Sequence, residues 1–564
     1  MSSTLKNAID PITLEIIFNG LRSITDESYI ALMKSAYSTN IKERHDHSTA
    51  ICDRHGRLVV QAENSLPIHL ASMTGLMSAL LNKYPVEQIQ PGDLFVANDP
   101  HVAGGTHLPD INMAMPVFAG GYIVGFIANI AHHADVGGMA PGSMAGGMAE
   151  IYQEGLRIPV VKLFAAGELQ RDLFELMLLN VRIPEERRGD YHAQIAACRL
   201  GERRLGEMLE RYEADVLERA FGEITGRTRN RMRALIADLP DGTYAFEDVM
   251  DDDGLGHVNV KIKLEIKVVG DRITFDFTGS DKQVTGNINL TTNATESAIC
   301  YAIKALLDPD VPNNAGVLDC FDLVTQPGTV VDCKFPAPVA ARAHTCQRVV
   351  DIIIGALAKA LPEQAVGAAN GANTTAVFSG VDPRSGDSYL YLETLGGGFG
   401  GRSDRDGTDG IQVHITNTSN LPIEAIEMEY PLRVESYGFV EDSGGAGQYR
   451  GGLGLRRVIR PVDHVCIFNG AGERFDNQPW GIFGAAAGRR GQFIHVREDG
   501  SQEQLAIKPS AITLLPKEQL IMETPGAGGY GAPCDRPDEL IEDDRESGKF
   551  TDDYLARHYG RGET

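Results

Sequence analysis

The sequence predicts an α+β protein: a large, mixed, sheet-rich molecule of several layers, with an inserted helical hairpin and a Gly-rich β region toward the C-terminus. Three observations support this prediction. Short apolar runs separated by Gly, Asp, Asn and Pro fill residues 40–163, as buried strands and turns do. Residues 168–239 show apolar spacing typical of helices. Glycine provides 62 of the 564 residues, which argues against a helical bundle.

The predicted elements begin with a helix and a strand-rich region. Asp10 and Pro11 are typical of a capped helix start, and the apolar spacing predicts a helix that reaches about Tyr37. With the strands that follow, residues 1–165 form one predicted region. Pro184 opens a long charged pattern, so residues 166–240 are predicted to be a helical segment, either a hairpin or a lid between two sheet regions.

The second half is predicted to return to sheet. Residues 241–378 are an expected α+β region, with strict strand alternation, a hairpin turn at Gly270 and helices near 296–307 and 347–361. Residues 379–533 are an expected Gly-rich β region. Residues 534–564 are an acidic tail. The residues on the alternating strand face are Val258, Val260, Ile262, Leu264 and Ile266. The apolar anchors of the tail are Tyr554, Leu555 and Tyr559.

Charge and composition narrow the functional classes. The chain has 52 Lys and Arg against 77 Asp and Glu, a formal net charge of −25, so we expect neither nucleic-acid nor membrane-surface binding. No stretch approaches the roughly 18 apolar residues of a membrane span, and the N-terminus does not resemble a leader. The eight cysteines are dispersed, without a C-x-x-C pair. We therefore expect a cytoplasmic protein with reduced, buried thiols.

Histidines concentrate in three short segments of the first third. Residues 40–48, 98–110 and 131–138 hold six of the 15 histidines of the chain. His107 and Asp110 lie three apart in a predicted turn, and His132 would come from a neighbouring strand end. These residues would give the mixed nitrogen and oxygen shell that a borderline divalent cation such as zinc or manganese prefers, and Asp46 could complete it. Capped turns and hydrogen-bonded core histidines are the structural alternative.

Other motifs give weaker indications. Arg157 could clamp an anionic group, or it could form an ion pair with Glu150 or Glu154. Residues 396–401 and 526–531 match G-x-G-x-x-G in letters, but neither clearly opens a helix, so a dinucleotide site is not expected. No G-x-x-x-x-G-K-[ST] loop occurs. Any nucleotide chemistry is therefore expected to belong to another chain.

Several motifs together resemble the hydantoinase B/oxoprolinase family, and the resemblance spans nearly the whole chain. They are Asn98-Asp99-Pro100, Thr106-His107-Leu108-Pro109-Asp110, His132-His133-Ala134-Asp135, Pro141-Gly142-Ser143-Met144, Glu150-Ile151-Tyr152, Glu154-Gly155-Leu156-Arg157-Ile158-Pro159, Pro338-Val339-Ala340-Ala341-Arg342 and Thr524-Pro525-Gly526-Ala527-Gly528-Gly529-Tyr530-Gly531.

The resemblance implies a soluble ATP-dependent system of two chains. A hydantoinase A-type partner with an actin-like ATPase fold would bind ATP and Mg²⁺ and phosphorylate the carbonyl oxygen of a cyclic amide. This chain would then complete the reaction within a hetero-oligomer. The resemblance points to His107, Asp110 and His132 as metal ligands, with Asp46 as a fourth. Catalytic roles would fall to Asp135 or His133, which could move a proton, and to Arg157.

Three functional hypotheses follow. The leading one is the B subunit of an ATP-dependent hydrolase acting on a lactam, hydantoin or 5-oxoproline-like ring, because activation of the amide oxygen permits attack by metal-activated water. The second is the matching subunit of an ATP-dependent ketone carboxylase of the acetone or acetophenone type. The third, from a different class, is a non-catalytic scaffold for the ATPase chain, which predicts no bound metal.

Overall fold

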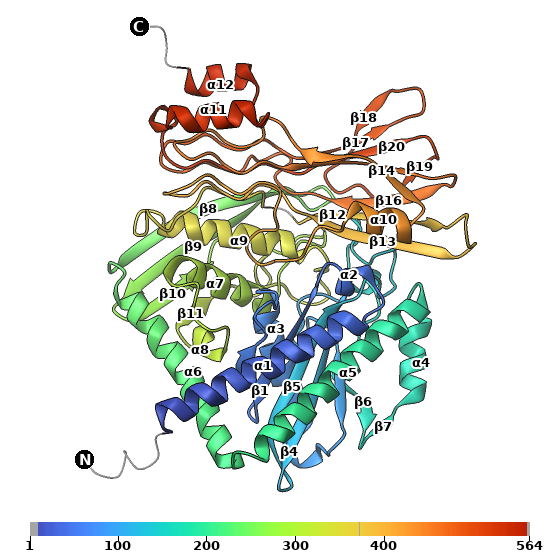
Figure 1. Ribbon diagram of the computed structural model, residues 1–564, viewed down its shortest axis with the longest axis vertical. Helices are drawn as coiled ribbons and strands as arrows, with labels where there is room; N and C mark the ends of the chain where they lie inside the picture. The colour runs from blue at the N-terminus through green and yellow to red at the C-terminus, as the bar shows by residue number, and fades with distance from the viewer. Residues whose placement is uncertain (1–8, 372, 561–564) are drawn as a thin grey trace.

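The computed structural model describes residues 9–371 and 373–560, and within them the chain forms four β-sheets with helices packed around them. Figure 1 shows the N-terminal sheet and its helices in the lower half, a second sheet with α7 and α9 at mid-height, and the C-terminal sheets above them. The helices α11 and α12 lie at the top, next to the C-terminus. The predicted α+β class, with its Gly-rich β C-terminal region, is confirmed.

The first sheet has seven strands in the order β2-β1-β5-β4-β3-β6-β7, and every neighbouring pair is antiparallel. Alternation along the strands directs Ile51 and Ile127 to one core and Cys52 and Phe126 to another, so both faces are covered. The strands are β1 (His47–Asp53), β2 (Leu58–Gln61), β3 (Leu94–Ala97), β4 (Asp110–Ala119), β5 (Tyr122–His132), β6 (Val161–Ala165) and β7 (Glu168–Leu169).

Long helices cover one face of this sheet (Figure 1). Asp10 caps the first of them, since its Oδ2 accepts from the backbone N–H of Thr13 at 2.9 Å, as its sequence indicated. The predicted hairpin is formed by α5 and α6, whose apolar residues pack into the core. The N-terminal helices are α1 (Pro11–Ser35), α2 (Thr39–Lys42), α3 (His69–Lys83), α4 (Arg171–Leu179), α5 (Pro184–Leu209) and α6 (Ala214–Ala237), with 3₁₀ turns at Val86–Gln88 and Ile151–Gln153.

The helix α3 corrects the expectation that strands and turns fill residues 40–163. It covers the opposite face of the first sheet, where Met73, Leu76, Met77 and Leu80 pack against the inner side chains of the strands. Their spacing is helical, but Gly75 and several Ser and Thr residues interrupt the apolar pattern. At Gly75 a side chain would meet the backbone of Gly104 at 2.6 Å, so close packing requires the glycine.

The second sheet has the order β11-β10-β9-β8, with β10 and β11 parallel. Gly270 makes the predicted hairpin turn with φ +59°. Of the predicted strand face, Val258 is 66% exposed because it starts the strand beyond the edge of the core, and the other four residues are buried. The elements are β8 (Gly242–Asp252), β9 (Val258–Val269), β10 (Arg272–Asp276), β11 (Phe321–Val324), α7 (Thr292–Leu307), α8 (Ala315–Leu318) and α9 (Arg342–Leu357).

Two further sheets, β13-β12-β16-β19 and β14-β15-β20-β17-β18, share one apolar core that includes Phe378, Phe468 and Phe493. The predicted tail anchors are buried against the loops beneath α11 and α12. The elements are β12 (Thr374–Val381), β13 (Ser388–Leu395), α10 (Ile423–Glu429), β14 (Leu432–Phe439), β15 (Leu455–Pro461), β16 (Cys466–Ala471), β17 (Gln492–Val496), β18 (Gln502–Gln504), β19 (Ile512–Leu514), β20 (Gln519–Glu523), a 3₁₀ turn at Pro533–Asp535, α11 (Asp538–Glu546) and α12 (Asp552–Tyr559).

The two Gly-rich motifs pack against each other and against neighbouring loops. A Cβ at Gly400 would lie 1.8 Å from the carbonyl oxygen of Gly367, and one at Gly528 would lie 1.9 Å from that of Trp480. The N–H of Gly401 donates to the carbonyl oxygen of Gly528 at 2.9 Å. Neither motif opens an α-helix within the described chain, and these glycines allow close backbone packing.

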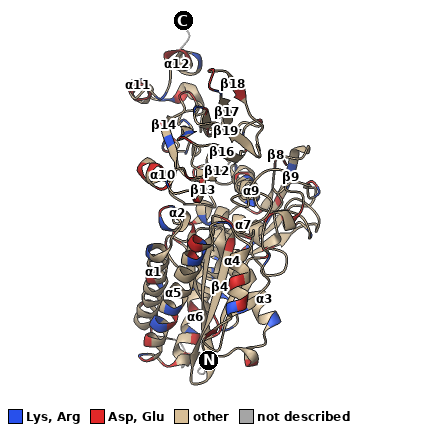
Figure 2. Ribbon diagram, turned by 90° about the vertical axis from the view of Figure 1, so that its right-hand side faces the viewer, with Lys and Arg blue, Asp and Glu red and all other residues tan. Residues whose placement is uncertain are grey.

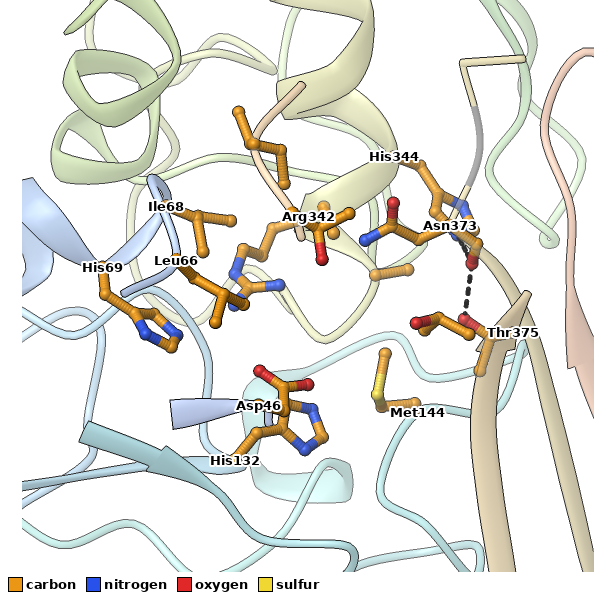
Figure 3. Close-up of a pocket in the computed structure, with 15 residues that line it drawn as sticks. Asp46, Leu66, Ile68, His69, His132, Met144, Arg342, His344, Asn373 and Thr375 are labelled. Carbon is orange, nitrogen blue, oxygen red and sulfur yellow. Dashed lines mark hydrogen bonds between the residues drawn. The ribbon is translucent and has the colours of Figure 1, made fainter. Parts of the chain in front are cut away.

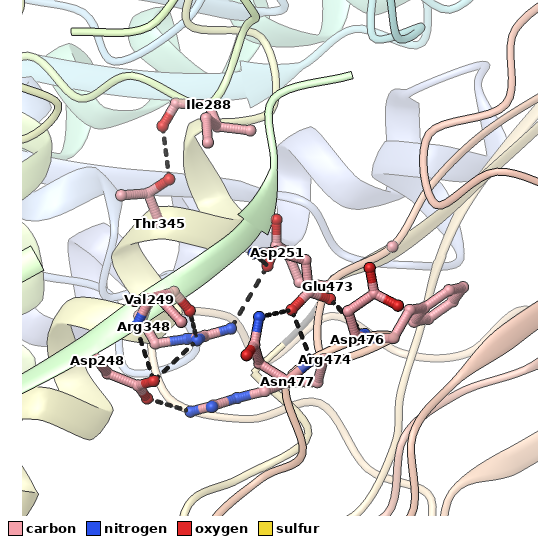
Figure 4. Close-up of polar contacts among 12 residues, drawn as sticks. Asp248, Val249, Asp251, Ile288, Thr345, Arg348, Glu473, Arg474, Asp476 and Asn477 are labelled. Atoms are coloured by element: carbon pink, nitrogen blue, oxygen red, sulfur yellow. Dashed lines mark hydrogen bonds and ion pairs between the residues drawn. The ribbon is translucent and has the colours of Figure 1, made fainter. Parts of the chain in front are cut away.

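A network of buried charges joins α9 to the C-terminal region (Figure 4). Arg474 bridges Asp248 at 2.9 Å and Asp351 at 2.8 Å, and Arg348 lies 3.3 Å from Asp248 and 3.4 Å from Glu473. Buried charges persist in a fold when each has a partner. No local sequence pattern predicted this network, because its members come from β8, α9 and the segment after β16.

The exterior is charged and the thiols are mostly internal. Figure 2 shows Lys, Arg, Asp and Glu along the outer helices α1, α5 and α6, whereas β4 between the helices is largely without charge. Seven cysteines are buried and free, as predicted, while Cys534 is exposed. Among the described residues, no helix combines the length and apolarity that a membrane crossing requires.

Candidate metal centre

Three predicted ligands meet at one end of the first sheet. Asp110 begins β4 and His132 ends β5, and the antiparallel register pairs these two residues directly. His107 comes from the turn that precedes β4. One ligand atom from each of the three lies within 4.8 Å of the others, and the His107 and His132 ring centroids are 5.0 Å apart. Residues that the sequence placed on separate segments therefore form one buried cluster.

Hydrogen bonds from outside the cluster fix His107 and Asp110. His107 Nδ1 donates to the carbonyl oxygen of Ala340 at 3.0 Å, which leaves Nε2 as the unprotonated nitrogen of the neutral ring. Asp110 Oδ2 accepts from Thr106 Oγ1 at 3.1 Å and from Arg342 Nη2 at 2.8 Å. The remaining atoms, His107 Nε2 and Asp110 Oδ1, are 3.2 Å apart. Each residue thus turns one lone-pair atom toward the other.

Asn40 holds the third residue. Its Nδ2 lies 2.7 Å from the carbonyl oxygen of His132 and 3.0 Å from the ring Nδ1 of the same residue. Arg44 donates to Asn40 Oδ1 at 2.5 Å, which orients the amide so that its amino group faces His132. The end of β5 is therefore tied to the short helix α2.

The residues of the cluster fit a divalent cation. Within the described chain, His107 Nε2 and Asp110 Oδ1 are buried without a hydrogen-bond partner, which is costly unless another group satisfies them. Burial lowers the pKa of His107 and of His132. Burial also opposes ionisation of Asp110, but His107 and Arg342 outweigh it and hold the pKa of this carboxyl well below its usual range. Neutral imidazoles and a carboxylate are the forms that bind metals such as zinc or manganese.

A cavity of about 30 Å³ lies beside the cluster (Figure 3). By the space that one water needs, it holds about two water-sized groups. His69, His132 and Arg342 are among the side chains on one side, and Asn373 and Thr375 lie across from them (Figure 3). The cluster therefore adjoins a small polar space that could receive part of a ligand.

Asp46 faces this cavity and is not one of the three clustered residues. Figure 3 shows its carboxylate beside His132. Burial raises the pKa of Asp46, although Arg44 opposes the shift. The next residue, His47, begins β1 and stacks on Tyr29 with ring centroids 4.0 Å apart, so it belongs to the core. Asp46 as a fourth ligand stays a prediction.

His133 and Asp135 have protein partners away from the cluster. His133 Nε2 is 2.9 Å from Gln194 Oε1, and burial lowers the pKa of His133 to about 4. Both oxygens of Asp135 are engaged by the backbone N–H groups of Gly137 and Gly142 and by Arg182, whose backbone N–H and Nη1 each donate at 2.9 Å. These contacts hold the loop after β5 in place.

Arg157 pairs with neither Glu150 nor Glu154. Its Nε donates to Asp99 Oδ2 at 2.6 Å, and the guanidinium lies 4.7 Å from the centroid of the Phe335 ring. The expected ion-pair partners were near in sequence, whereas the actual partner follows β3.

Two residues beside the cluster were missed as site residues. His69, at the start of α3, places Nε2 3.7 Å from Asp110 Oδ1, and its Nδ1 is 2.8 Å from Ser48 Oγ. Arg342, at the start of α9, donates the hydrogen bond to Asp110 that is described above. Arg342 was visible only as part of a motif, and His69 becomes a candidate once α3 is recognised, because it faces the sheet from the first turn of that helix.

Comparison with known proteins decides the family. The family model described as Hydantoinase B/oxoprolinase matches residues 10–533. The chain belongs to the hydantoinase B/oxoprolinase family. The predicted resemblance is confirmed, and it covers the cluster, the cavity and the Gly-rich loops.

Relatives match over nearly the full chain. An uncharacterized protein of Methanocaldococcus jannaschii is 38% identical over 98% of this chain and 96% of its own length. The caprolactamase subunit beta of Pseudomonas jessenii is 32% identical over 98% of this chain and 96% of its own length. This family member is therefore similar to a caprolactamase subunit over nearly its whole length.

Solved structures agree with the fold. A chain of the ATP-dependent caprolactamase from Pseudomonas jessenii superposes with a TM-score of 0.92 at 30% identity, covering 98% of this chain and 96% of that one. A chain of nucleotide-free acetone carboxylase has a TM-score of 0.90 at 19% identity, covering 98% and 79%. At that identity the acetone carboxylase match shows the fold alone.

Proposed function

We propose that this protein is the B subunit of an ATP-dependent cyclic-amide hydrolase acting on a ring of the lactam, hydantoin or 5-oxoproline type. One observation carries the proposal: a buried His107, Asp110 and His132 cluster with unpaired ligand atoms adjoins a cavity. The end-to-end similarity to a caprolactamase subunit beta supports the cyclic amide as substrate class.

A divalent cation, zinc or manganese, would be held by His107, Asp110 and His132, with Asp46 reaching it from the cavity. When bound, such a cation supplies Lewis-acid chemistry that lowers the pKa of a water from about 15.7 to roughly 7. The chain itself keeps the ligands in place: Arg342 orients Asp110, the Ala340 carbonyl sets the tautomer of His107, and Asn40 donates to the backbone carbonyl oxygen of His132.

The amide must be activated before water attacks it, because resonance stabilises it and its nitrogen is a poor leaving group. A hydantoinase A-type partner that binds ATP and Mg²⁺ would phosphorylate the carbonyl oxygen, and this chain would open the activated ring within a cytoplasmic hetero-oligomer. The names of relatives as subunits support a partner. The lack of a phosphate-binding loop in the sequence is in keeping with ATP binding elsewhere.

The contacts of His133, Asp135 and Arg157 favour positioning roles over direct proton transfer or anion clamping. Asp135 is saturated by donors, His133 bonds to α5, and Arg157 is paired. All three stabilise loops that surround the cluster, and substituting any of them is expected to act through the placement of these loops.

The test combines the purified chain, its partner, ATP and zinc or manganese with caprolactam, hydantoin and 5-oxoproline, and measures ADP and ring-opened product. We expect ring opening that requires both chains and ATP, and that Asp110→Asn abolishes. Turnover by this chain without ATP would overturn the proposal. Full activity of the Asp110→Asn complex without bound metal would instead support the scaffold hypothesis.

The second candidate is the subunit of an ATP-dependent ketone carboxylase. The sequence resemblance implies this alternative, and the fold shared with an acetone carboxylase chain at a TM-score of 0.90 is compatible with it. Adding acetone or acetophenone with bicarbonate separates the two functions. ATP consumption that requires bicarbonate and yields a carboxylated ketone would establish the carboxylase and reject the hydrolase.

A further inference from the structure

Arg44 is a buried cation that makes no direct ion pair within the described chain, although its charge acts on the Asp46 carboxyl. Its side chain is 0% exposed, and no Asp or Glu oxygen of the described chain lies within 4.0 Å of its guanidinium. Its hydrogen bonds go to Asn40 Oδ1, to Thr394 Oγ1 at 2.5 Å and to Thr418 Oγ1 at 3.3 Å, while Nε lacks a partner among the described residues. A buried charge is costly unless something compensates it.

The charge of Arg44 reaches the cavity through Thr394. A guanidinium only donates hydrogen bonds, so the oxygen of Thr394 must accept from it and the hydroxyl proton is left for another acceptor. Thr394 is one of the residues that line the cavity beside the candidate metal centre, whereas Arg44 and Thr418 do not line it. The Thr394 hydroxyl is therefore a polarised donor at the cavity wall.

Asn373 supplies a second donor to the same space. Its Oδ1 accepts from Gln347 Nε2 at 2.7 Å, which assigns the oxygen side of the amide to α9 and leaves the amino group for the cavity. Figure 3 shows Asn373 opposite Asp46 and His132, next to His344. Asp46, the carboxylate that lines the cavity, lies on the side of the candidate metal centre. The opposite side, with Asn373, therefore carries hydrogen-bond donors and, among the described residues, no carboxylate.

We infer that this end of the cavity is a subsite for an anionic oxygen group of the substrate, held by Thr394 and Asn373, with Arg44 as its buried counter-charge. The inference rests on the proposed function, because it adds an anionic group to the cyclic amide. The cavity of about 30 Å³ has room for about two water-sized groups, which matches two oxygens of such an anion. The group has two chemical sources: a carboxylate on the ring, or the phosphoryl group of an activated substrate.

The test is calorimetric binding to the full chain as purified, with metal content checked in every variant. The probes are 5-oxoproline, 2-pyrrolidinone, which is the same five-membered lactam without the carboxylate, and inorganic phosphate. We expect wild-type protein to bind 5-oxoproline at least about ten-fold more tightly than 2-pyrrolidinone, as loss of a charge-assisted hydrogen bond predicts.

Three variants locate the effect. Thr394→Val should lower the affinity for 5-oxoproline about ten-fold and change the affinity for 2-pyrrolidinone by no more than about two-fold. Asn373→Asp keeps an acceptor for Gln347 but adds a negative charge that repels the anion. It should therefore lower the affinity for 5-oxoproline further. Thr418→Val is the matched control, because it also deprives Arg44 of an acceptor but does not line the cavity, and it should change neither affinity.

The outcomes separate the two sources and the two proposals. Phosphate binding that depends on Thr394, with both lactams bound alike, assigns the subsite to a phosphoryl group. If the folded, metal-replete Thr394→Val and Asn373→Asp variants bind the anions with the same affinity as wild type, the subsite is overturned. Ring opening tests the proposed function separately: Thr394-dependent anion binding without ATP-dependent ring opening would reject that function and keep the subsite.

Discussion

Replacing Asp110 by Asn tests the metal centre with the smallest change of shape. Asn keeps an oxygen that can accept from Thr106 and Arg342, but it places a neutral amino group where Oδ1 now faces His107 Nε2. This change removes the only carboxylate of the clustered three and leaves two imidazoles as ligands. The expected result is loss of metal from a chain that still folds.

The magnitude follows from what Asp110 contacts. Removing a ligand should cost more than removing an outer hydrogen bond, which typically weakens metal binding 10–100-fold. We therefore expect at least a 100-fold loss of zinc or manganese affinity, or about 2.8 kcal/mol. Weakening the buried contact with Arg342, now 2.8 Å long, should cost about 1–3 kcal/mol of folding stability, because Arg342 retains a neutral acceptor.

Metal content by mass spectrometry, competition with a chelator of known affinity and thermal unfolding measure these effects. Asp351→Asn is the matched control, because Asp351 is also buried between an arginine and a histidine, at 2.8 Å from Arg474 and 3.0 Å from His414. It should lose similar stability and keep its metal. If folded Asp110→Asn protein bound zinc and manganese as wild type does, the assigned metal centre would be wrong.

Three further predictions use other contacts. Arg342→Lys loses the planar fork that reaches Thr106 through Nε and Asp110 through Nη2, so metal affinity should fall about 10–100-fold in the chelator assay, and an unchanged affinity would show that Arg342 does not position the ligand. Burial raises the pKa of Glu154 to about 8, so the native state holds a proton that the unfolded chain releases. The free energy of unfolding should therefore fall by up to about 1.4 kcal/mol per pH unit as the pH rises from roughly 5 to 8. Glu154→Gln should flatten this loss in unfolding experiments across that range, and an identical pH slope would contradict it. Gly400→Ala should cost about 3 kcal/mol or more or prevent folding, while Gly438→Ala, where a Cβ meets nothing within 4 Å, should unfold like wild type.

The sequence predicted the parts of the fold that local periodicity encodes. Strands β8, β9 and β10 and the start of α1 follow from alternation and from Asp10 as a cap, because these signals need only neighbouring residues. The helix α3 was not predicted, because Gly75 and the hydroxyl residues of this helix weaken its apolar stripe. The need for a glycine at position 75 arises from Gly104, which is distant in sequence.

The candidate metal centre was partly predictable for the same reason. His107 and Asp110 share one turn, and His132 is placed opposite Asp110 by a strand register that the hairpin fixes. The contacts of Arg342 and His69 depend on how α9 and α3 dock against that sheet, which no local spacing encodes. The partner of Arg157 was mistaken because proximity along the chain was taken for proximity in space.

The dependence of His107 on the Ala340 carbonyl, 233 residues further along the chain, has a consequence for biosynthesis. A ribosome that has released only the first sheet has made every imidazole and carboxylate of the centre, yet not the loop that sets one tautomer nor the arginine that steadies Asp110. Tight capture of the proposed metal ion would therefore wait for the middle of the polypeptide, so that nascent or truncated chains would not bind it and its loading would report that α9 has docked.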